Sequence, residues 1–409
     1  MFSYEDEINK LRLELSTNSS PVQQDPPIFK FPEYSFSTLE TQFSTPPFPK
    51  KAKIDTTHEH TRSSKDYNKL EPLEHSTAPI SPVVKKEGFD WLVVYNPKVP
   101  RELSIELLHS FDHGSVVCCV KFSRDGSLIA TGSNKVIYVF DVNTGKQKCV
   151  LNIPSDDSRV DLYVRALSFS VDGTKLVSGA EDQLLRVWDI ETGVVDTVLK
   201  GHGQDIYSVD CSSDGKFIAS GSGDHSVRIW DYLTGDCIHI LLPEEEEGKE
   251  VGATSVAISP DSKYVLSGSL DHSVRLWDLH SGTLLHTLNS HTNSVYSVAF
   301  SPDGSFFCSG SLDKTIKVWK MGETVSLEKT TAGHKDFVLS VAYSNDGKWL
   351  VSGSKDRSVQ FWDRGCSTQL MLQGHKNSVI SIAMSQNGNF FATGSGDCRA
   401  RIWQYRPFK

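Results

Sequence analysis

One short pattern recurs along the chain and limits the possible folds more than any other feature. Copies read SGSGDHSVRIWD at 220–231, SGSLDHSVRLWD at 267–278 and SGSKDRSVQFWD at 352–363. The aromatic residue near the end of each unit recurs after 48, 42, 47, 42, 43 and 41 residues, at Phe140, Trp188, Trp230, Trp277, Trp319, Trp362 and Trp403. A unit of this size cannot bury a core alone, so neighbouring units must stack on one another.

Each unit divides into four short apolar runs. In the unit that starts at Gly201, these are IYSVDCS, FIASGS, VRIWD and GDCIHILL. An Asp-Gly pair separates the first two runs in five units, and Asn387-Gly388 and Asp261-Ser262 are the variants. Such pairs tolerate the positive φ of tight hairpin turns. The first run is apolar or small on both faces, as expected for a strand between two neighbours.

Seven units with this period and this strand content match the WD-repeat signature, in which each repeat builds one four-stranded propeller blade. The sequence therefore predicts an all-β fold, a seven-bladed β-propeller over residues 89–409. The stretch LSIELLHSF at 103–111 precedes the first unit and has the pattern of a strand. We expect it to complete the last blade beside ARIWQY, which would leave no open sheet edge in the ring.

The recurring letters have a structural interpretation in this family, where a His, a Ser or Thr, a turn Asp and a Trp form a buried hydrogen-bonded chain. The resemblance implies four complete sets: His202/Ser220/Asp224/Trp230, His291/Ser309/Asp313/Trp319, His334/Ser352/Asp356/Trp362 and His375/Thr393/Asp397/Trp403. A buried indole N–H needs an acceptor and a buried carboxylate needs donors. We call each set a tetrad.

Three units depart from the tetrad. The first has Phe140 in place of Trp and lacks the turn Asp, the second has Val160 in place of His, and the fourth has Lys249 there. We expect these blades to be held more by apolar packing. A His–Ser–Asp set resembles a hydrolase triad, but four copies around a ring, each with a Trp, indicate a structural role. The chain has no GxSxG, Walker, HExxH or spaced metal-ligand motif, so we expect no enzyme, no cofactor and no metal site.

The residues that differ between units indicate where a partner binds. In propellers, the positions just after the His loop and just before the turn Asp point to one rim, the top face. Here they are Tyr163, Arg165, Glu181, Tyr207, Leu270, Tyr296, Leu312, Phe337, Lys355 and Asn377. We call these ten residues the rim set. Several aromatic and leucine side chains exposed on one face predict a protein-binding surface. The alternative is that some of the rings fold back onto their own blades.

The first 88 residues differ in composition from the rest. They contain Pro-rich and Ser/Thr-rich runs such as TNSSPVQQDPP, and we expect them to be disordered. A short amphipathic helix over 4–16 is the exception, because apolar residues recur there at helical spacing. The basic cluster PKKAK at 49–53 fits a nuclear localisation signal or a chance cluster.

Charge and cysteine usage narrow the class of protein further. The net charge of −9 argues against direct sequence-specific DNA binding, which usually depends on a basic surface. No apolar stretch approaches the roughly 20 residues that span a bilayer, so we expect no membrane partner. Eight cysteines without a CxxC pair indicate reduced thiols in a cytosolic or nuclear protein.

Several stretches go beyond the general repeat. WLVVYNPKVPREL, GAEDQLLRVWDIETG, GHGQDIYS and LMLQGHKNSVISIA resemble the fungal Tup-type transcriptional corepressors, whose animal relatives of similar plan are the Groucho-type proteins. The resemblance covers about residues 89–409 and implies a nuclear, non-enzymatic scaffold. It implies that DNA-bound repressor proteins bind the top face, with contacts carried over to Tyr163, Glu181, Leu270, Tyr296, Lys355 and Asn377.

The family also has a long N-terminal helix that tetramerises and binds a tetratricopeptide-repeat corepressor, and a middle region that contacts histone tails and deacetylases. Here the N-terminal region is short, so these partners do not carry over in the same way. Two other functions stay open. A ubiquitin-ligase substrate receptor would need an F-box-like segment, and a G-protein-beta-like scaffold would need a longer N-terminal coiled coil.

Overall fold

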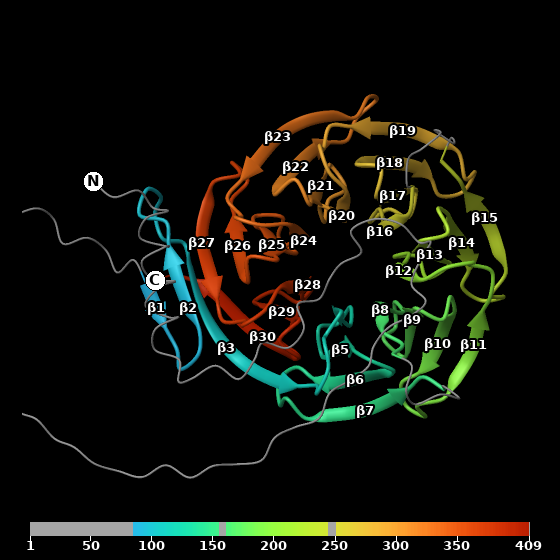
Figure 1. Ribbon diagram of the computed structural model, residues 1–409, viewed down its shortest axis with the longest axis horizontal. Helices are drawn as coiled ribbons and strands as arrows, with labels where there is room; N and C mark the ends of the chain where they lie inside the picture. Colours follow the sequence, from blue (N-terminus) through green and yellow to red (C-terminus); the bar gives the residue numbers. More distant parts are fainter. Residues whose placement is uncertain (1–84, 155–160, 244–250, 409) are drawn as a thin grey trace, which may run out of the picture. The chain divides into compact units, whose positions relative to one another are not determined.

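The computed structural model describes residues 85–154, 161–243 and 251–408. These residues contain thirty β-strands and no helix, arranged as seven antiparallel sheets around a centre (Figure 1). The all-β, seven-bladed fold expected from the repeat is confirmed. The stretches 4–16 and 49–53, and the two departing positions Val160 and Lys249, lie outside the described residues.

Blades are numbered here in chain order. Blade 1 contains β4 (Cys119–Phe122), β5 (Leu128–Gly132), β6 (Val136–Asp141) and β7 (Gln147–Asn152). Blade 2 contains β8 (Val164–Phe169), β9 (Lys175–Ala180), β10 (Leu185–Asp189) and β11 (Val195–Leu199). Blade 3 contains β12 (Ile206–Cys211), β13 (Phe217–Ser222), β14 (Val227–Asp231) and β15 (Cys237–Leu241). Blade 4 contains β16 (Ala253–Ile258), β17 (Tyr264–Ser269), β18 (Ser273–Asp278) and β19 (Leu284–Asn289).

The remaining blades follow the same plan, with additions at the end of the ring. Blade 5 contains β20 (Val295–Phe300), β21 (Phe306–Ser311), β22 (Thr315–Lys320) and β23 (Ser326–Ala332). Blade 6 contains β24 (Val338–Tyr343), β25 (Leu350–Ser354), β26 (Ser358–Trp362) and β27 (Thr368–Gln373), and it is extended by β2 (Leu92–Tyr95) and β1 (Lys85–Glu87). Blade 7 contains β28 (Val379–Met384), β29 (Phe390–Ser395), β30 (Arg399–Pro407) and β3 (Leu103–Asp112).

The first strand of each blade lies nearest the centre and the fourth at the perimeter (Figure 1). The first strands contact one another in sequence around the ring, and β28 of blade 7 contacts β4 of blade 1. The hairpin turns after these strands have the expected positive φ, including 74° at Gly215 and 55° at Ser262. The core lies between blades. In one such layer, Leu266 and Leu276 of blade 4 pack with Phe307 and Trp319 of blade 5.

Serine hydroxyls link the first strands of neighbouring blades. Ser208, Ser255, Ser297, Ser340 and Ser381 each accept a hydrogen bond from the backbone N–H of the next blade, at 2.9–3.1 Å. The last of these bonds joins blade 7 to the N–H of Val120 in blade 1. Blade 2 has Ala166 at the same position, so this hydroxyl is missing there.

The N-terminal side of the propeller contributes to two blades. The strand expected at 103–111 is β3, which pairs with β30 from Leu103↔Pro407 to Asp112↔Arg399. The segment before it was expected to be disordered up to residue 88, but residues 85–87 form β1 and pair with β2. In turn, β2 pairs with β27. The blade-6 sheet thus includes residues 85–87, which lie before the boundary at residue 88 that the composition indicated.

Candidate functional site

The four tetrads have the geometry of continuous hydrogen-bonded chains. In blade 3, the Trp230 indole N–H donates to Ser220 Oγ at 2.8 Å, and Ser220 Oγ is 2.7 Å from His202 Nε2. His202 Nδ1 lies 2.9 Å from Asp224 Oδ2. Ser220 and Trp230 are buried, and the His202 side chain is fully covered. The four side chains thus satisfy one another in a continuous series.

The same contacts recur in blades 5, 6 and 7. The distances from His Nε2 to the Ser or Thr hydroxyl are all 2.7 Å, and those from His Nδ1 to the carboxylate are 2.8–3.0 Å. The indole N–H of Trp319 donates to Ser309 Oγ at 3.0 Å in blade 5, and that of Trp362 donates to Ser352 Oγ at 2.8 Å in blade 6.

The tetrad hydroxyls lie too deep to belong to a binding site. Ser309 and Ser352 were expected to have a structural role, and both are 0% exposed. Each hydroxyl is enclosed between the histidine and the Trp of its own blade, with its hydrogen bonds already made. Ser309 and Ser352 therefore cannot contact a partner or a substrate, and their role is confined to the interior of the blade.

Hydrogen bonds set the charge state of the tetrad aspartates. Burial alone would raise the pKa of Asp224, but hydrogen bonds from His202, Ser226 and the Gly203 N–H hold that pKa well below its usual range. The pKa of three further aspartates is lowered in the same way, at Asp313, Asp356 and Asp397. The polar groups of the tetrads thus hydrogen-bond to one another and stabilise the blades.

Blades 2 and 4 do not rely on apolar packing alone, which corrects the expectation above. The Asp182 carboxylate accepts hydrogen bonds from Arg186 Nη1 at 3.1 Å and from Nη2 at 2.5 Å. In blade 4, Arg275 Nη2 lies 2.5 Å from Asp271 Oδ2. These arginines come from the third strand, where each is four residues after its aspartate. A buried guanidinium needs a carboxylate, so the third strand supplies the donor that the loop histidine supplies elsewhere.

Blade 1 keeps part of the tetrad. His113 Nε2 lies 2.7 Å from Thr131 Oγ1, and burial lowers the pKa of His113. Phe140 stacks on Phe111 of β3 with ring centroids 4.0 Å apart. The histidine and hydroxyl are therefore present, while stacked aromatic rings replace the Trp and the turn Asp.

Backbone pairing places rim residues of one blade beside each other. The Glu181 N–H donates to Tyr163 O at 3.2 Å, and the Lys355 N–H donates to Phe337 O at 2.9 Å. The N–H groups of Leu270 and Leu312 bond in the same way to loop carbonyls of their own blades. The loop before a first strand and the turn after the second strand thus meet at one end of each blade.

Four members of the rim set gather around a fifth, Arg165. Arg165 Nε lies 2.9 Å from Glu181 Oε1, and the Tyr163 N–H donates to Glu181 Oε2 at 2.9 Å. The Arg165 guanidinium carbon is 5.3 Å from the centroid of the Tyr163 ring. Burial raises the pKa of Tyr207 and Tyr296 to about 12, and the charge of Arg165 partly opposes both shifts. The tyrosine hydroxyls are therefore protonated at neutral pH and able to donate.

Other members of the rim set are distributed around the ring. Lys355 Nζ lies 4.6 Å from the centroid of the Phe337 ring, and Asn377 Nδ2 donates to Gly396 O at 3.3 Å. All ten residues of the rim set are half-buried, so each keeps part of its surface exposed.

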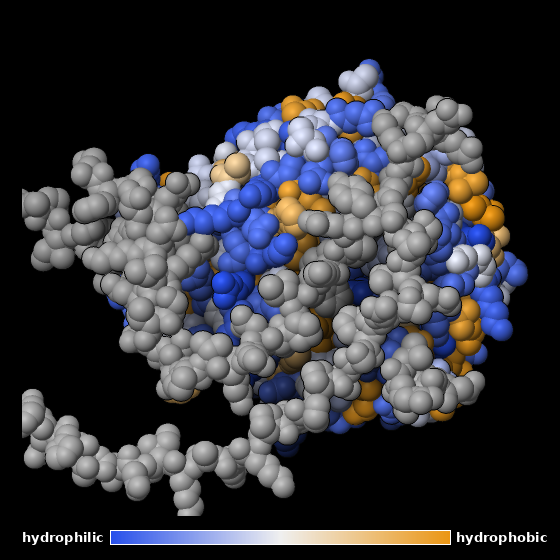
Figure 2. Space-filling model, viewed as in Figure 1, coloured by the Kyte–Doolittle hydropathy of each residue, from blue (hydrophilic) through white to orange (hydrophobic). Residues whose placement is uncertain are grey.

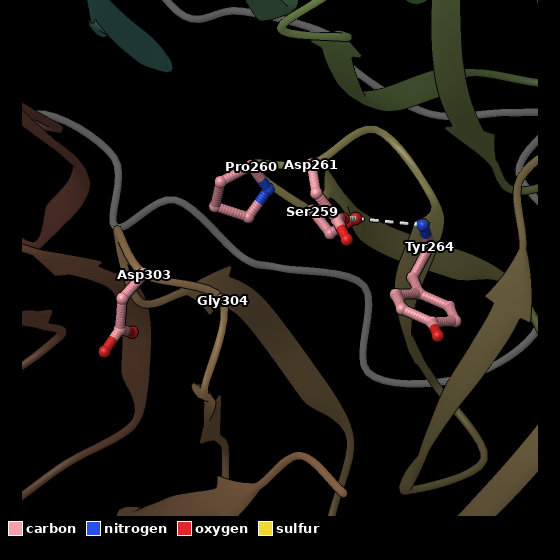
Figure 3. Close-up of a pocket in the computed structure, with 6 residues that line it drawn as sticks. All are labelled: Ser259, Pro260, Asp261, Tyr264, Asp303 and Gly304. Carbon is pink, nitrogen blue, oxygen red and sulfur yellow. Dashed lines mark hydrogen bonds between the residues drawn. The ribbon is translucent and has the colours of Figure 1, made fainter.

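A pocket of about 290 Å³ lies at the opposite end of the first strands. It is lined by the hairpin turns of blades 4 and 5, including Asp261, Tyr264 and Asp303 (Figure 3). Both aspartates accept a hydrogen bond at 2.6 Å from a serine hydroxyl of the same turn, Asp261 from Ser259 and Asp303 from Ser301. The carboxylates of Asp261 and Asp303 thus already accept hydrogen bonds within their own turns.

Two kinds of site are absent from the part of the chain that the structure describes. In residues 85–154, 161–243 and 251–408, no group of three or more His, Cys, Asp or Glu is placed to hold a metal ion. The same ranges contain no helix with the length and hydropathy needed to cross a membrane.

Sequence reasoning missed the arginines of the third strands and the contacts of residues 90–91. Arg401 of blade 7 pairs with Asp90, just before β2, and Trp91 packs edge-on against Trp403 with centroids 5.9 Å apart. The signal was present, because Arg recurs two residues before the Trp in VRIWD, VRLWD, LRVWD and ARIW.

Several known proteins similar to this chain are transcriptional regulators by name, and others are named only as WD repeat-containing proteins. "Transcriptional repressor rco-1" of Neurospora crassa is 49% identical over 127 residues, which are 31% of this chain and 21% of that protein. "General transcriptional corepressor tupA" of Dictyostelium discoideum is 53% identical over 174 residues, 42% of this chain and 30% of that protein. "General transcriptional corepressor TUP1" of Saccharomyces cerevisiae is 41% identical over 193 residues, 34% of this chain and 27% of that protein.

These matches confirm the resemblance to Tup-type corepressors, and they cover less than a third of each relative's length. The pattern described as "WD domain, G-beta repeat" matches seven consecutive segments: 105–141, 148–189, 193–231, 235–278, 282–320, 325–363 and 366–404. Since these segments take up most of the chain, and each ends one residue after an aromatic position of the repeat, the chain belongs to the WD-repeat family.

Proposed function

We propose that this protein is a non-enzymatic interaction scaffold that acts as a transcriptional corepressor in the nucleus. DNA-bound repressor proteins recruit it through the rim set. The observation that carries the proposal is the similarity to three proteins named as a transcriptional repressor or general corepressors, at 41–53% identity over 127–193 residues.

The chemistry of the rim set supports the choice of surface. Tyr163, Tyr207 and Tyr296 combine a ring with a protonated hydroxyl, and tyrosine is enriched among residues that dominate binding energy. Arg165 and Glu181 already form an ion pair, so a partner that brings a carboxylate to Arg165 must compete with Glu181. This competition favours partners with a matched charge pattern over a merely acidic surface.

The alternatives make different predictions for the same surface. A ubiquitin-ligase substrate receptor would bind degrons there and copurify with ligase subunits. A G-protein-beta-like scaffold would copurify with G-protein components. Binding of a tetratricopeptide-repeat corepressor, histone tails or deacetylases belongs to the N-terminal region in the family, and it stays a separate proposal for this chain.

Affinity purification from nuclear extract tests the proposal directly. Tagged wild-type protein is compared with Tyr163→Ala/Tyr296→Ala, and bound proteins are identified by mass spectrometry. Leu285→Ala serves as a matched control, because Leu285 is an exposed apolar residue on β19 and outside the rim set. We expect sequence-specific repressors with the wild type and with Leu285→Ala, and their loss from the folded double variant.

Two results would overturn the proposal. Ligase subunits or G-protein components in place of repressors would refute the corepressor function. An unchanged set of repressors on the double variant would refute the rim set as the recruiting surface.

A further inference from the structure

The blade 6–7 junction shows how this propeller accepts an added strand. There β2 pairs antiparallel with the perimeter strand β27, with Val94 opposite Met371. Just before β2, Asp90 forms an ion pair with Arg401, and Trp91 covers Gly374 and packs against Trp403. An acidic residue, an aromatic residue and an extended apolar strand thus dock together.

The blade 2–3 junction has the same receiving residues. Gly201, Arg228 and Trp230 occupy the places of Gly374, Arg401 and Trp403, because Arg228 pairs with Ser220 across the sheet as Arg401 pairs with Thr393. The Cβ position at Gly201 lies 2.7 Å from Arg228 Nη1 and 3.2 Å from the Trp230 ring. The corresponding distances at Gly374 are 3.0 Å and 3.1 Å.

No described residue covers this second junction in the way that Asp90 and Trp91 cover the first. Gly201 is exposed. In the described part of the chain, Arg228 has no carboxylate partner, and its nearest polar contact is Cys237 Sγ at 4.0 Å. Lys200 is exposed next to Gly201 and adds a second positive charge. The junction therefore presents uncompensated positive charge beside the exposed Gly201, under which Trp230 is buried.

The perimeter of the junction is apolar and accessible. Val198 of β11 takes the place of Met371, since each lies opposite the third-strand residue two before the Trp. Val198 is 39% exposed and Met371 only 1%, because Leu92 and Val94 of β2 pack on Met371. Both side chains lie on the face of the sheet that points away from the junction, whereas Leu199 packs against blade 3. Ile238 and Ile240 of β15 are also exposed. They lie on the Arg228 side of blade 3, because Ile240 pairs with Arg228 whereas His239 bonds to His280 O of blade 4. Figure 2 shows apolar residues at the perimeter in this region.

The other junctions that the structure describes lack this combination. At the position of Arg228, blades 1, 5 and 6 have Tyr138, Lys317 and Gln360. Blades 2 and 4 have arginines, but Asp182 and Asp271 already neutralise them.

We propose that the blade 2–3 junction is a second docking surface, for an extended segment of a partner protein. The segment carries an acidic residue, then an aromatic residue, then aliphatic residues at alternate positions. It adds to the edge of β11 that no described strand pairs with, and it places its carboxylate on Arg228 and its ring over Gly201. This surface lies on the perimeter, and the proposal does not depend on the rim set or on the corepressor function.

A peptide that copies residues 88–97, GFDWLVVYNP, is the probe, because it contains the segment that docks at the blade 6–7 junction. The fluorescein-labelled peptide is titrated with the full chain and fluorescence anisotropy is recorded. We expect saturable binding to the wild type, weaker by roughly tenfold in Arg228→Gln because one charge-assisted contact is lost. Val198→Lys should abolish binding. Leu285→Lys, a matched change on the perimeter strand of blade 4, should leave binding unchanged.

A second peptide, with asparagine in place of the aspartate, distinguishes the loss of the carboxylate contact from unfolding of the Arg228→Gln variant. It should bind the wild type about as weakly as the original peptide binds Arg228→Gln, and the two changes together should add little. Absence of saturable binding would overturn the proposal. So would equal binding to wild type and Arg228→Gln, which would mean that the peptide exchanges with β2 at the blade 6–7 junction.

Discussion

Two groups of blades bind the aspartate of the turn with different residues. The partner is a histidine in blades 3, 5, 6 and 7 and an arginine in blades 2 and 4. In both groups a half-buried aspartate sits in the turn after the second strand, and a Trp on the third strand donates to a Ser or Thr hydroxyl. In the first group a loop histidine bonds the aspartate, and in the second an arginine of the third strand does so.

The comparison shows that these six blades share the aspartate, whereas the residue that donates to it is exchangeable. The aspartate also accepts backbone and hydroxyl hydrogen bonds that shape the turn, such as those from Ser226 to Asp224 and from Ser273 to Asp271. A donor must neutralise it, but the donor can approach from the loop or from within the sheet. Where the loop supplies histidine, the arginine position is free for another use, as at Arg401 and Arg228.

Acid should affect both groups at once and produce the largest loss. The folded-state pKa of Asp224, Asp313, Asp356, Asp397 and Asp271 lies below the ordinary value of 3.8. A lowered pKa stabilises the fold above the unfolded-state value, and this stabilisation is lost as the pH falls through the folded-state value. We therefore expect stability to fall from about pH 4 downward, in urea titrations followed by Trp fluorescence.

Asp397→Asn checks which groups are responsible. The variant removes one titrating carboxylate, so its stability should depend less on pH between about 5 and 3 than that of the wild type. An unchanged slope would mean that carboxylates outside the blade turns control acid unfolding.

Removal of the shared Trp should have the next largest effect, and it should be equal in both groups. Trp188 and Trp230 are both buried, and each donates to a serine at 2.8 Å. Trp188→Ala and Trp230→Ala should each lower the free energy of unfolding by about 3–5 kcal/mol, measured by urea denaturation. A cost confined to Trp230→Ala would show that the histidine blades depend on the Trp in a way that arginine blades do not.

Replacement of the arginine should separate the groups. Arg186→Gln leaves Asp182 without its charged partner and should cost about 3 kcal/mol. Arg228→Gln is the matched control, since Arg228 occupies the same strand position without a carboxylate, and it should cost less than about 1 kcal/mol. The double variant Asp182→Asn/Arg186→Gln should recover part of the loss. Equal costs at Arg186 and Arg228 would contradict the assignment of Arg186 as the donor.

The sequence predicted the ring, the turns and the tetrads because each depends on residues at fixed offsets within one repeat. Trp230, for example, finds Ser220 across a single hairpin. The Asp90–Arg401 pair joins residues 311 apart, so no local pattern contains it. The half-buried state of Tyr207 and Tyr296 depends on how neighbouring blades approach each other, which a repeat pattern does not specify. The exchange of histidine for arginine was visible in the letters, but only the geometry shows that both reach the same carboxylate.

A blade can be converted from one donor to the other, and this gives the smallest and sharpest effect. His334→Ala removes a bond of 3.0 Å to Asp356 and leaves the carboxylate short of a donor, at a cost of about 1–3 kcal/mol. Gln360 occupies the arginine position of blade 6 and is buried beside His334. Adding Gln360→Arg should therefore restore more than half of the lost stability, because the new guanidinium can reach Asp356 as Arg275 reaches Asp271.

Gln360→Arg in the wild-type background is the control and should bring no gain in stability, since His334 already bonds to the aspartate. If the double variant is no more stable than His334→Ala in thermal denaturation, the two donors are not exchangeable, and the difference between the blade groups reflects their surroundings.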